Sequence, residues 1–141
     1  MIDKDILLNV WLQEATRQPI EAVEMREYQR VLLDFLDVLD SLDRLVTLAE
    51  PTAPRADDPT ITWIEHLRTL RNQLLESLRR AGVDFFECIG QRFDPSRHEA
   101  VETIQRYDVD DYTVVEQLIR GCEWRGHVLR FARVVVARRS D

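Results

Sequence analysis

The chain has 141 residues and a formal net charge of -7, from 19 basic and 26 acidic side chains. This acidity argues against a nucleic-acid-binding protein, because binding to phosphates requires a basic face. There are two cysteines, and no apolar run approaches the roughly 20 residues that span a bilayer. We therefore expect a cytoplasmic protein with reduced thiols that does not bind membranes.

Charge and glycine content both change along the chain. Residues 1–60 hold six basic and thirteen acidic side chains, and all four glycines follow residue 81. Glycine favours turns and is rare inside helices. We therefore predict an α+β protein, with a helical dimerisation region over residues 1–81 and a small β-domain over residues 82–141.

The first predicted elements are helices. Residues 3–17 place apolar side chains on one side, and Pro19 is expected to interrupt or restart the helix because proline lacks an N–H. A long helix without Gly or Pro follows over residues 20–49. Its acidic residues at every third position are interpreted mainly as a solvated face. These residues are Asp34, Asp37, Asp40 and Asp43.

A heptad seam runs along the long helix, with apolar residues at alternating steps of four and three. A second apolar stripe beside it makes the buried arc wider than a two-stranded coiled coil needs, which favours a bundle. The second stripe contains Val31, Leu36, Val38 and Leu45. Residues 50–60 are predicted to be a proline-rich loop, and residues 62–81 a second helix that begins with a Thr62–Glu65 capping box.

The two long helices are predicted to form an antiparallel hairpin. Two helices make too thin a core for stripes this broad, so we expect a homodimer whose hairpins form a four-helix bundle. The alternative is a monomer in which the C-terminal domain covers the stripes. The predicted dimer interface consists of Tyr28, Leu32, Phe35, Leu39, Leu42, Val46, Leu67, Leu70 and Leu74.

After Gly82, short apolar stretches alternate with turn residues, which predicts strands. The stretches are residues 83–89, 98–104, 113–119 and 128–137. We expect a tight turn at residues 124–127, with Gly126 at positive φ. The last stretch is interpreted as one continuous strand.

Candidate catalytic sites are few. Residues 98–102 lack the second histidine of a zincin motif and lie in a predicted strand, and residues 108–111 lack the glycine and glutamate of a calcium loop. Nothing in the sequence positions a base beside Cys88 or Cys122. No glycine-rich phosphate loop occurs. The residues alone therefore indicate an interaction protein with no enzyme activity, cofactor, metal or bound nucleotide.

Two C-terminal segments carry a more specific pattern. They are GVDFFECIGQRFDPSRHEAV at residues 82–101 and TVVEQLIRGCEWRGHVLRFARVVVA at residues 113–137. Together with LLDFLDVLDSLDRL at residues 32–45, they resemble the GrpE family, the nucleotide-exchange factors of DnaK-type chaperones. The resemblance extends over residues 25–137.

This resemblance implies a dimer that binds the ATPase domain of a DnaK-type chaperone and wedges it open, so that ADP leaves. It also implies a set of partner-binding residues, one on the helices and the others on the β-domain. They are Trp63, Phe93, Pro95, His98, His127, Arg130, Phe131 and Val136.

The chain also departs from the family pattern. Fewer residues precede the bundle helix than is usual, and five positions carry unusual residues. These positions are Trp63, Cys122, Arg125, His127 and Phe131. The alternative function is therefore a dimeric scaffold or regulatory adaptor that keeps the fold without exchange activity.

Overall fold

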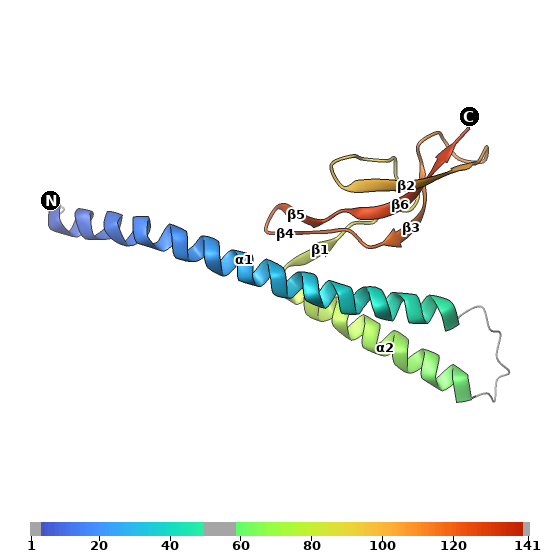
Figure 1. The fold of residues 1–141 in the computed structure, drawn as a ribbon, viewed down its shortest axis with the longest axis horizontal. Helices are drawn as coiled ribbons and strands as arrows, with labels where there is room; N and C mark the ends of the chain where they lie inside the picture. The colour runs from blue at the N-terminus through green and yellow to red at the C-terminus, as the bar shows by residue number, and fades with distance from the viewer. Residues whose placement is uncertain (1–3, 50–58, 140–141) are drawn as a thin grey trace. The chain divides into compact units, whose positions relative to one another are not determined.

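A computed structural model describes residues 4–49 and 59–139 of the chain (Figure 1). Within these two ranges, two helices are followed by six strands, which confirms the predicted α+β class. The chain divides into two compact units, one ending at Leu36 and the other beginning at Asp37. The units therefore divide inside the first helix, whereas the change from helix to strand comes after the second.

Helix α1 spans Lys4–Ala49 without a break. The prediction that Pro19 interrupts or restarts the helix is wrong. A proline inside a helix removes one backbone hydrogen bond and bends the axis, but it ends the helix only where the flanking sequence also disfavours it. No glycine or second proline lies within residues 4–49, so the helix continues through Pro19.

Helix α2 spans Pro59–Arg80 and begins three residues before the predicted capping box. A proline suits the first helical position, because its N–H is missing where no acceptor exists and its φ is already helical. Residues 50–58 of the predicted loop lie outside the described residues. At the other end, Gly82 has a φ of 95° and its N–H donates to Arg79 O at 3.0 Å, which closes the helix.

The second compact unit contains an antiparallel helical hairpin, in which α2 runs back beside the C-terminal part of α1 (Figure 1). An ion pair of 3.9 Å joins Arg71 of α2 to Asp43 of α1. Within this unit, the buried apolar side chains of the two helices are Leu39, Val46, Ile64, Leu75 and Leu78. The hairpin therefore has one narrow apolar seam of its own.

The β-lobe, residues 83–138, holds two three-stranded sheets. The first has the order β1-β4-β5 and is antiparallel. The second has the order β2-β6-β3, with β2 parallel and β3 antiparallel to the central strand. The strands are β1 Val83–Phe85, β2 His98–Gln105, β3 Val114–Ile119, β4 Cys122–Trp124, β5 His127–Arg130 and β6 Ala132–Arg138.

The β-lobe has a compact apolar core of small and branched side chains. Phe86 and Phe93 pack against this core from the connections between strands. The core residues are Cys88, Val114, Ala132, Val134 and Val136. Small and β-branched residues fit the pleated, closely packed interior of a small sheet.

The apolar stretch 128–137 is two strands and not one, contrary to the prediction. It breaks at Phe131, so that β5 joins the first sheet and β6 the second. At the break, the Ala132 N–H donates to Arg97 O at 2.9 Å. The predicted turn at residues 124–127 is confirmed, with positive φ at both Arg125 and Gly126.

The junction between the two sheets depends on a close backbone approach at Gly121. A Cβ placed on Gly121 would lie 2.3 Å from the backbone N of Ala132, well inside contact distance. Only glycine fits at this crossing, because the obstacle is backbone and cannot rotate away.

We predict that Gly121→Ala lowers the free energy of unfolding by about 3 kcal/mol, because the sheets must move apart to accept a methyl group. Urea unfolding followed by circular dichroism measures this change. Gly90→Ala is the matched control, since Gly90 has a φ of 84° but no atom within 4 Å of an added Cβ. The Gly90→Ala change should lower the free energy of unfolding by about 1 kcal/mol, because alanine disfavours positive φ. Equal losses in the two variants would contradict a role for the close approach.

Candidate protein-interaction site

The residues implied as partner contacts differ widely in exposure. Trp63 on α2 is 69% exposed and Phe131, between β5 and β6, is 46% exposed. His127 and Pro95 are also exposed. Phe93 is half-buried, because it packs against the core of the β-lobe. These five side chains are accessible to a partner.

Two other implied contacts are not on the surface. Val136 is 2% exposed and belongs to the core of the β-lobe, and His98 is 6% exposed. Neither side chain can contact a partner unless the lobe opens. The strand pattern could not reveal this, since β6 is buried on both faces from Val134 to Ala137, so its alternation does not distinguish an inner from an outer face.

His98 instead holds the turn that precedes β2. Its Nδ1 accepts a hydrogen bond of 3.0 Å from the Asp94 N–H, and the His98 N–H donates back to Asp94 O at 2.8 Å. Asp94 Oδ1 accepts from the Ser96 N–H at 2.9 Å and from the Ser96 hydroxyl at 2.6 Å. The motif FDPSRH is therefore a self-contained turn that presents Pro95 to solvent.

Burial is the main cause of a lowered pKa at His98. The neighbouring Asp94 carboxylate acts to raise this pKa and Arg97 acts to lower it, both more weakly. A neutral imidazole matches the hydrogen bond to the Asp94 N–H, because a protonated Nδ1 could not accept it.

Arg130, also implied as a partner contact, is engaged within the chain. Its Nη1 and Nη2 donate to the two carboxylate oxygens of Asp40 at 2.7 and 2.9 Å, and its Nε donates to Arg120 O at 2.9 Å. Arg120 forms a second such pair, donating to Asp43 at 2.7 and 3.1 Å. We call these four side chains the ionic clamp, because they join α1 to the β-lobe.

An open groove of about 610 Å³ runs beside the clamp, between β3 and the two helices. Asp43, Arg71 and Arg120 line it on the polar side. Leu48, Ile89 and Leu118 line it with apolar side chains that are each at least half exposed. Leu118 could have been expected here, since Glu116 and Leu118 alternate onto one exposed face of β3.

The residues of the predicted dimer interface fall into two groups. Leu32, Leu39 and Val46 are already buried within the chain, and Leu42, Leu67 and Leu74 are half-buried. Only Tyr28, Phe35 and Leu70 are exposed. In the second unit, the exposed apolar residues of the helices are Val38, Leu45, Leu48, Trp63 and Leu70. The exposed stripe therefore lies beside the predicted seam on α1, whereas on α2 it shares Leu70 with the predicted interface.

The thiols are poorly suited to nucleophilic chemistry. Cys88 and Cys122 are free and buried, and burial raises the pKa of Cys122 to about 11 and that of Cys88 above its usual value. A thiol is reactive as its thiolate, which such pKa values suppress. Among the described residues, no three potential metal ligands gather together. Neither described helix has the length and apolar character needed to cross a bilayer.

The GrpE family model matches residues 10–138, which include α1 from its seventh residue on, all of α2 and every described strand. The chain belongs to the GrpE family.

Curated relatives agree with this assignment. The chain is 30% identical over 80 residues to Protein GrpE of Bacillus cereus (strain AH820) and to that of Bacillus anthracis. It is 31% identical over 81 residues to Protein GrpE of Bacillus cytotoxicus. These matches cover 57% of this chain but only 41–43% of each relative, so less than half of each relative's length is represented.

We predict that the turn around His98 makes stability depend on pH. The folded pKa lies below the ordinary value near 6.5, so the unfolded chain binds the proton more readily. The free energy of unfolding that neutral His98 contributes is therefore complete above pH 6.5 and is lost as the pH falls below that value. Urea unfolding at pH 7.5 and 5.5 should show a larger loss for the wild type than for His98→Gln. Equal losses would contradict this role of His98.

Proposed function

We propose that this protein is a GrpE-type cochaperone that accelerates ADP release from the ATPase domain of a DnaK-type chaperone. The main support is the family match over residues 10–138, because it includes the helical hairpin and the β-lobe together. A match confined to one of them would fit a shared fragment. The proposed activity needs both parts, because the β-lobe contacts the chaperone and the helical hairpin holds the lobe.

The mechanism requires no catalytic residue. A protein that binds the open state of an ATPase domain better than the closed state shifts the population toward the open state. If it weakens ADP binding, then ADP weakens its binding by the same factor. Buried thiols of raised pKa and accessible apolar side chains on the β-lobe are consistent with a factor that acts by contact alone.

The proposed contact surface is made of the accessible residues of the β-lobe. Phe131, Pro95 and His127 are exposed, and Phe93 is half-buried against the core of the lobe. Aromatic side chains supply much of the binding energy in protein interfaces. Trp63 is a further proposed contact on α2, where the centroids of its ring and of the His66 ring lie 5.9 Å apart in an edge-on arrangement.

We also propose that two chains form a dimer through their hairpins. On α1, Val38 and Leu45 are exposed seven residues apart, and on α2 Trp63 and Leu70 repeat that spacing. A hairpin with one buried seam and one exposed apolar stripe on each helix presents what a four-helix bundle needs from each subunit. Large exposed apolar patches are uncommon on soluble monomers.

Stopped-flow release of a fluorescent ADP analogue tests the activity. The chaperone of the same cell, preloaded with the analogue, is mixed with excess ATP and increasing amounts of this protein. We expect the release rate to rise and then saturate. No acceleration at saturation would contradict exchange activity and favour the scaffold or adaptor function, which the unusual residues Trp63, Arg125 and His127 leave as the alternative.

We predict that Phe131→Ala weakens chaperone binding about tenfold without dissociating the dimer, because removing a half-exposed interface aromatic costs more than about 1 kcal/mol. The concentration that gives half-maximal ADP release measures this effect. Tyr107→Ala is the matched control, since Tyr107 is an exposed aromatic that lies outside the proposed contact set. Equal weakening by both variants would contradict the proposed surface.

We predict that Val38→Glu combined with Leu45→Glu converts the dimer to a monomer, because two carboxylates would be buried without partners in the bundle. Sedimentation equilibrium should show a fall from about twice 16.6 kDa to 16.6 kDa. Asn72→Glu with Gln73→Glu is the control, at two exposed polar positions of α2. A wild-type mass of 16.6 kDa would contradict the dimer.

A further inference from the structure

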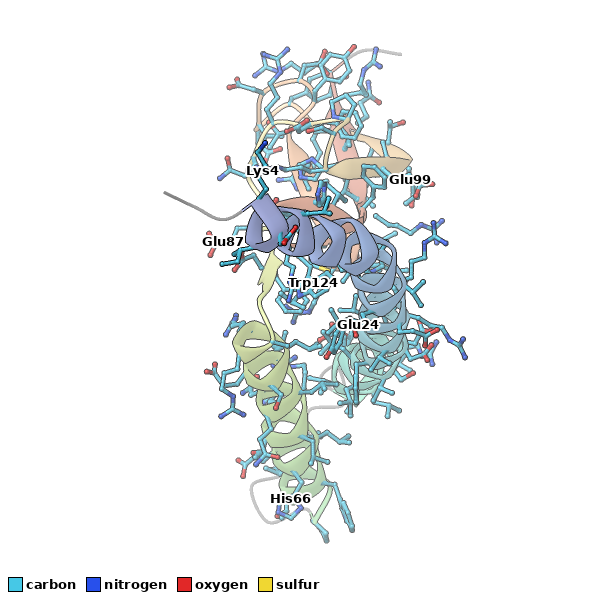
Figure 2. The ribbon with its side chains drawn as sticks, turned by 90° about the vertical axis from the view of Figure 1, so that its left-hand side faces the viewer. Lys4, Glu24, His66, Glu87, Glu99 and Trp124 are labelled. Atoms are coloured by element: carbon cyan, nitrogen blue, oxygen red, sulfur yellow. The ribbon has the colours of Figure 1, made fainter. Side chains whose placement is uncertain are left out.

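Polar contacts join the β-lobe to the helical hairpin at two places. The first is its chain connection to α2, where the Trp124 indole N–H donates to Ala81 O at 3.1 Å (Figure 2). The second is the ionic clamp to α1, formed by Asp40, Asp43, Arg120 and Arg130. A body held at one place can turn about it, whereas a second attachment fixes its direction.

The clamp has the geometry of a specific contact. Each arginine meets its carboxylate through two hydrogen bonds of 2.7–3.1 Å, which fixes the relative orientation of the two planar groups. The two aspartates lie three residues apart on α1, so they share one helix face. Asp34 and Asp37, one helical turn earlier in the same series, are exposed.

The clamp is also accessible to water. Its four side chains are between 18 and 30% exposed, and Asp40, Asp43 and Arg120 line the open groove. Charges at such sites can be rehydrated when a pair separates, so opening costs far less than for a buried pair. The contact is therefore directional but reversible.

A second cation, the Arg71 guanidinium, also lies close to Asp43. Arg71 Nε lies 3.9 Å from Asp43 Oδ1, too far for a hydrogen bond, and it has no hydrogen-bond partner among the described residues. Two arginines from different elements thus approach one carboxylate, and only Arg120 is bonded to it. If Arg120 leaves, the 3.9 Å ion pair between Arg71 and Asp43 can shorten to a hydrogen bond.

We propose that Asp40 and Asp43 are positioning residues that fix the direction in which the β-lobe is presented to the chaperone. When the clamp opens, Asp43 exchanges Arg120 for Arg71, and the lobe turns about its attachment at Ala81 and Trp124. This inference rests on the proposed exchange function, but the clamp itself can be tested without the chaperone.

A distance measurement tests the clamp directly. Spin labels are attached at Asn72→Cys in α2 and Glu102→Cys in β2. Pulsed electron paramagnetic resonance then measures the distance between the two labels, and so the separation of the hairpin and the lobe. Labelled chains are diluted with unlabelled chains so that each dimer carries one pair. The native thiols are buried with raised pKa values, so the labels react at the introduced sites.

We expect a narrow distance distribution in the wild type and a broad one in Asp40→Asn/Asp43→Asn. Asp34→Asn/Asp37→Asn is the matched control, with the same charge change on the same helix, and should stay narrow. The swapped pair Asp40→Arg/Arg130→Asp is a second variant, which should be narrower than either of its single changes. An unchanged distribution in Asp40→Asn/Asp43→Asn, or equal broadening in the control, would overturn the proposal.

The exchange of partners at Asp43 has its own test. In double-mutant cycles, the coupling between Asp43 and Arg71 should be small in the wild type and larger when Arg120 is replaced by glutamine. Coupling that does not increase would overturn the role of Arg71.

The functional arm uses the ADP-release assay. We expect Asp40→Asn/Asp43→Asn to reduce the acceleration about tenfold at saturation, because misdirected contact groups lose effectiveness, with an unchanged dimer mass. Full acceleration in this variant would overturn the positioning role. If the wild type itself gives no acceleration, the proposed function fails, while the distance distributions still decide whether the clamp directs the lobe.

Discussion

The attachment of the β-lobe to the helices determines the direction in which the lobe presents its exposed side chains. The lobe contributes two arginines and one indole, and the helical side contributes two carboxylates of α1 and the carbonyl of Ala81, just after the end of α2. These contacts are polar and directional, so they give the lobe a defined direction relative to α2.

The heptad pattern illustrates why exposure could not be read from the sequence. Two apolar stripes with the same spacing lie side by side on α1, and either could face inward. The structure buries Leu39 and Val46 within the chain and leaves Val38 and Leu45 exposed. A heptad repeat identifies a helix with apolar stripes, but the neighbouring elements decide which stripe they cover.

Much of the architecture was predictable because it depends on local signals. The change from helix to strand, the strand at His98–Gln105 and the turn before His127 all follow from glycine placement and apolar patterning. The continuity of α1 through Pro19 was not predictable from one local rule, since the flanking residues outweigh the lost hydrogen bond. The break at Phe131 also escaped, because an apolar run shows no sign of changing sheets.

The interaction residues were predictable only in part. Family resemblance indicated Arg130 and Val136 as contacts, yet one is held by Asp40 and the other is in the core. The acidic series on α1 was interpreted as solvated, which holds for Asp34 and Asp37 but not for the next two members. Their arginine partners lie 77 and 90 residues away in the chain, a separation that no local pattern reveals.

The position of β6 affects how this protein folds while it is being synthesised. It is the central strand of its sheet, yet it comes last of the six, and its parallel partner β2 begins more than thirty residues earlier. Until the ribosome has made β6, β2 and β3 lack the central strand with which both pair. The long loop between β2 and β6 must then close before these two strands can pair. The helices complete their local hydrogen bonds first. During that interval the nascent chain carries unpaired strand edges, the kind of surface on which chaperones act.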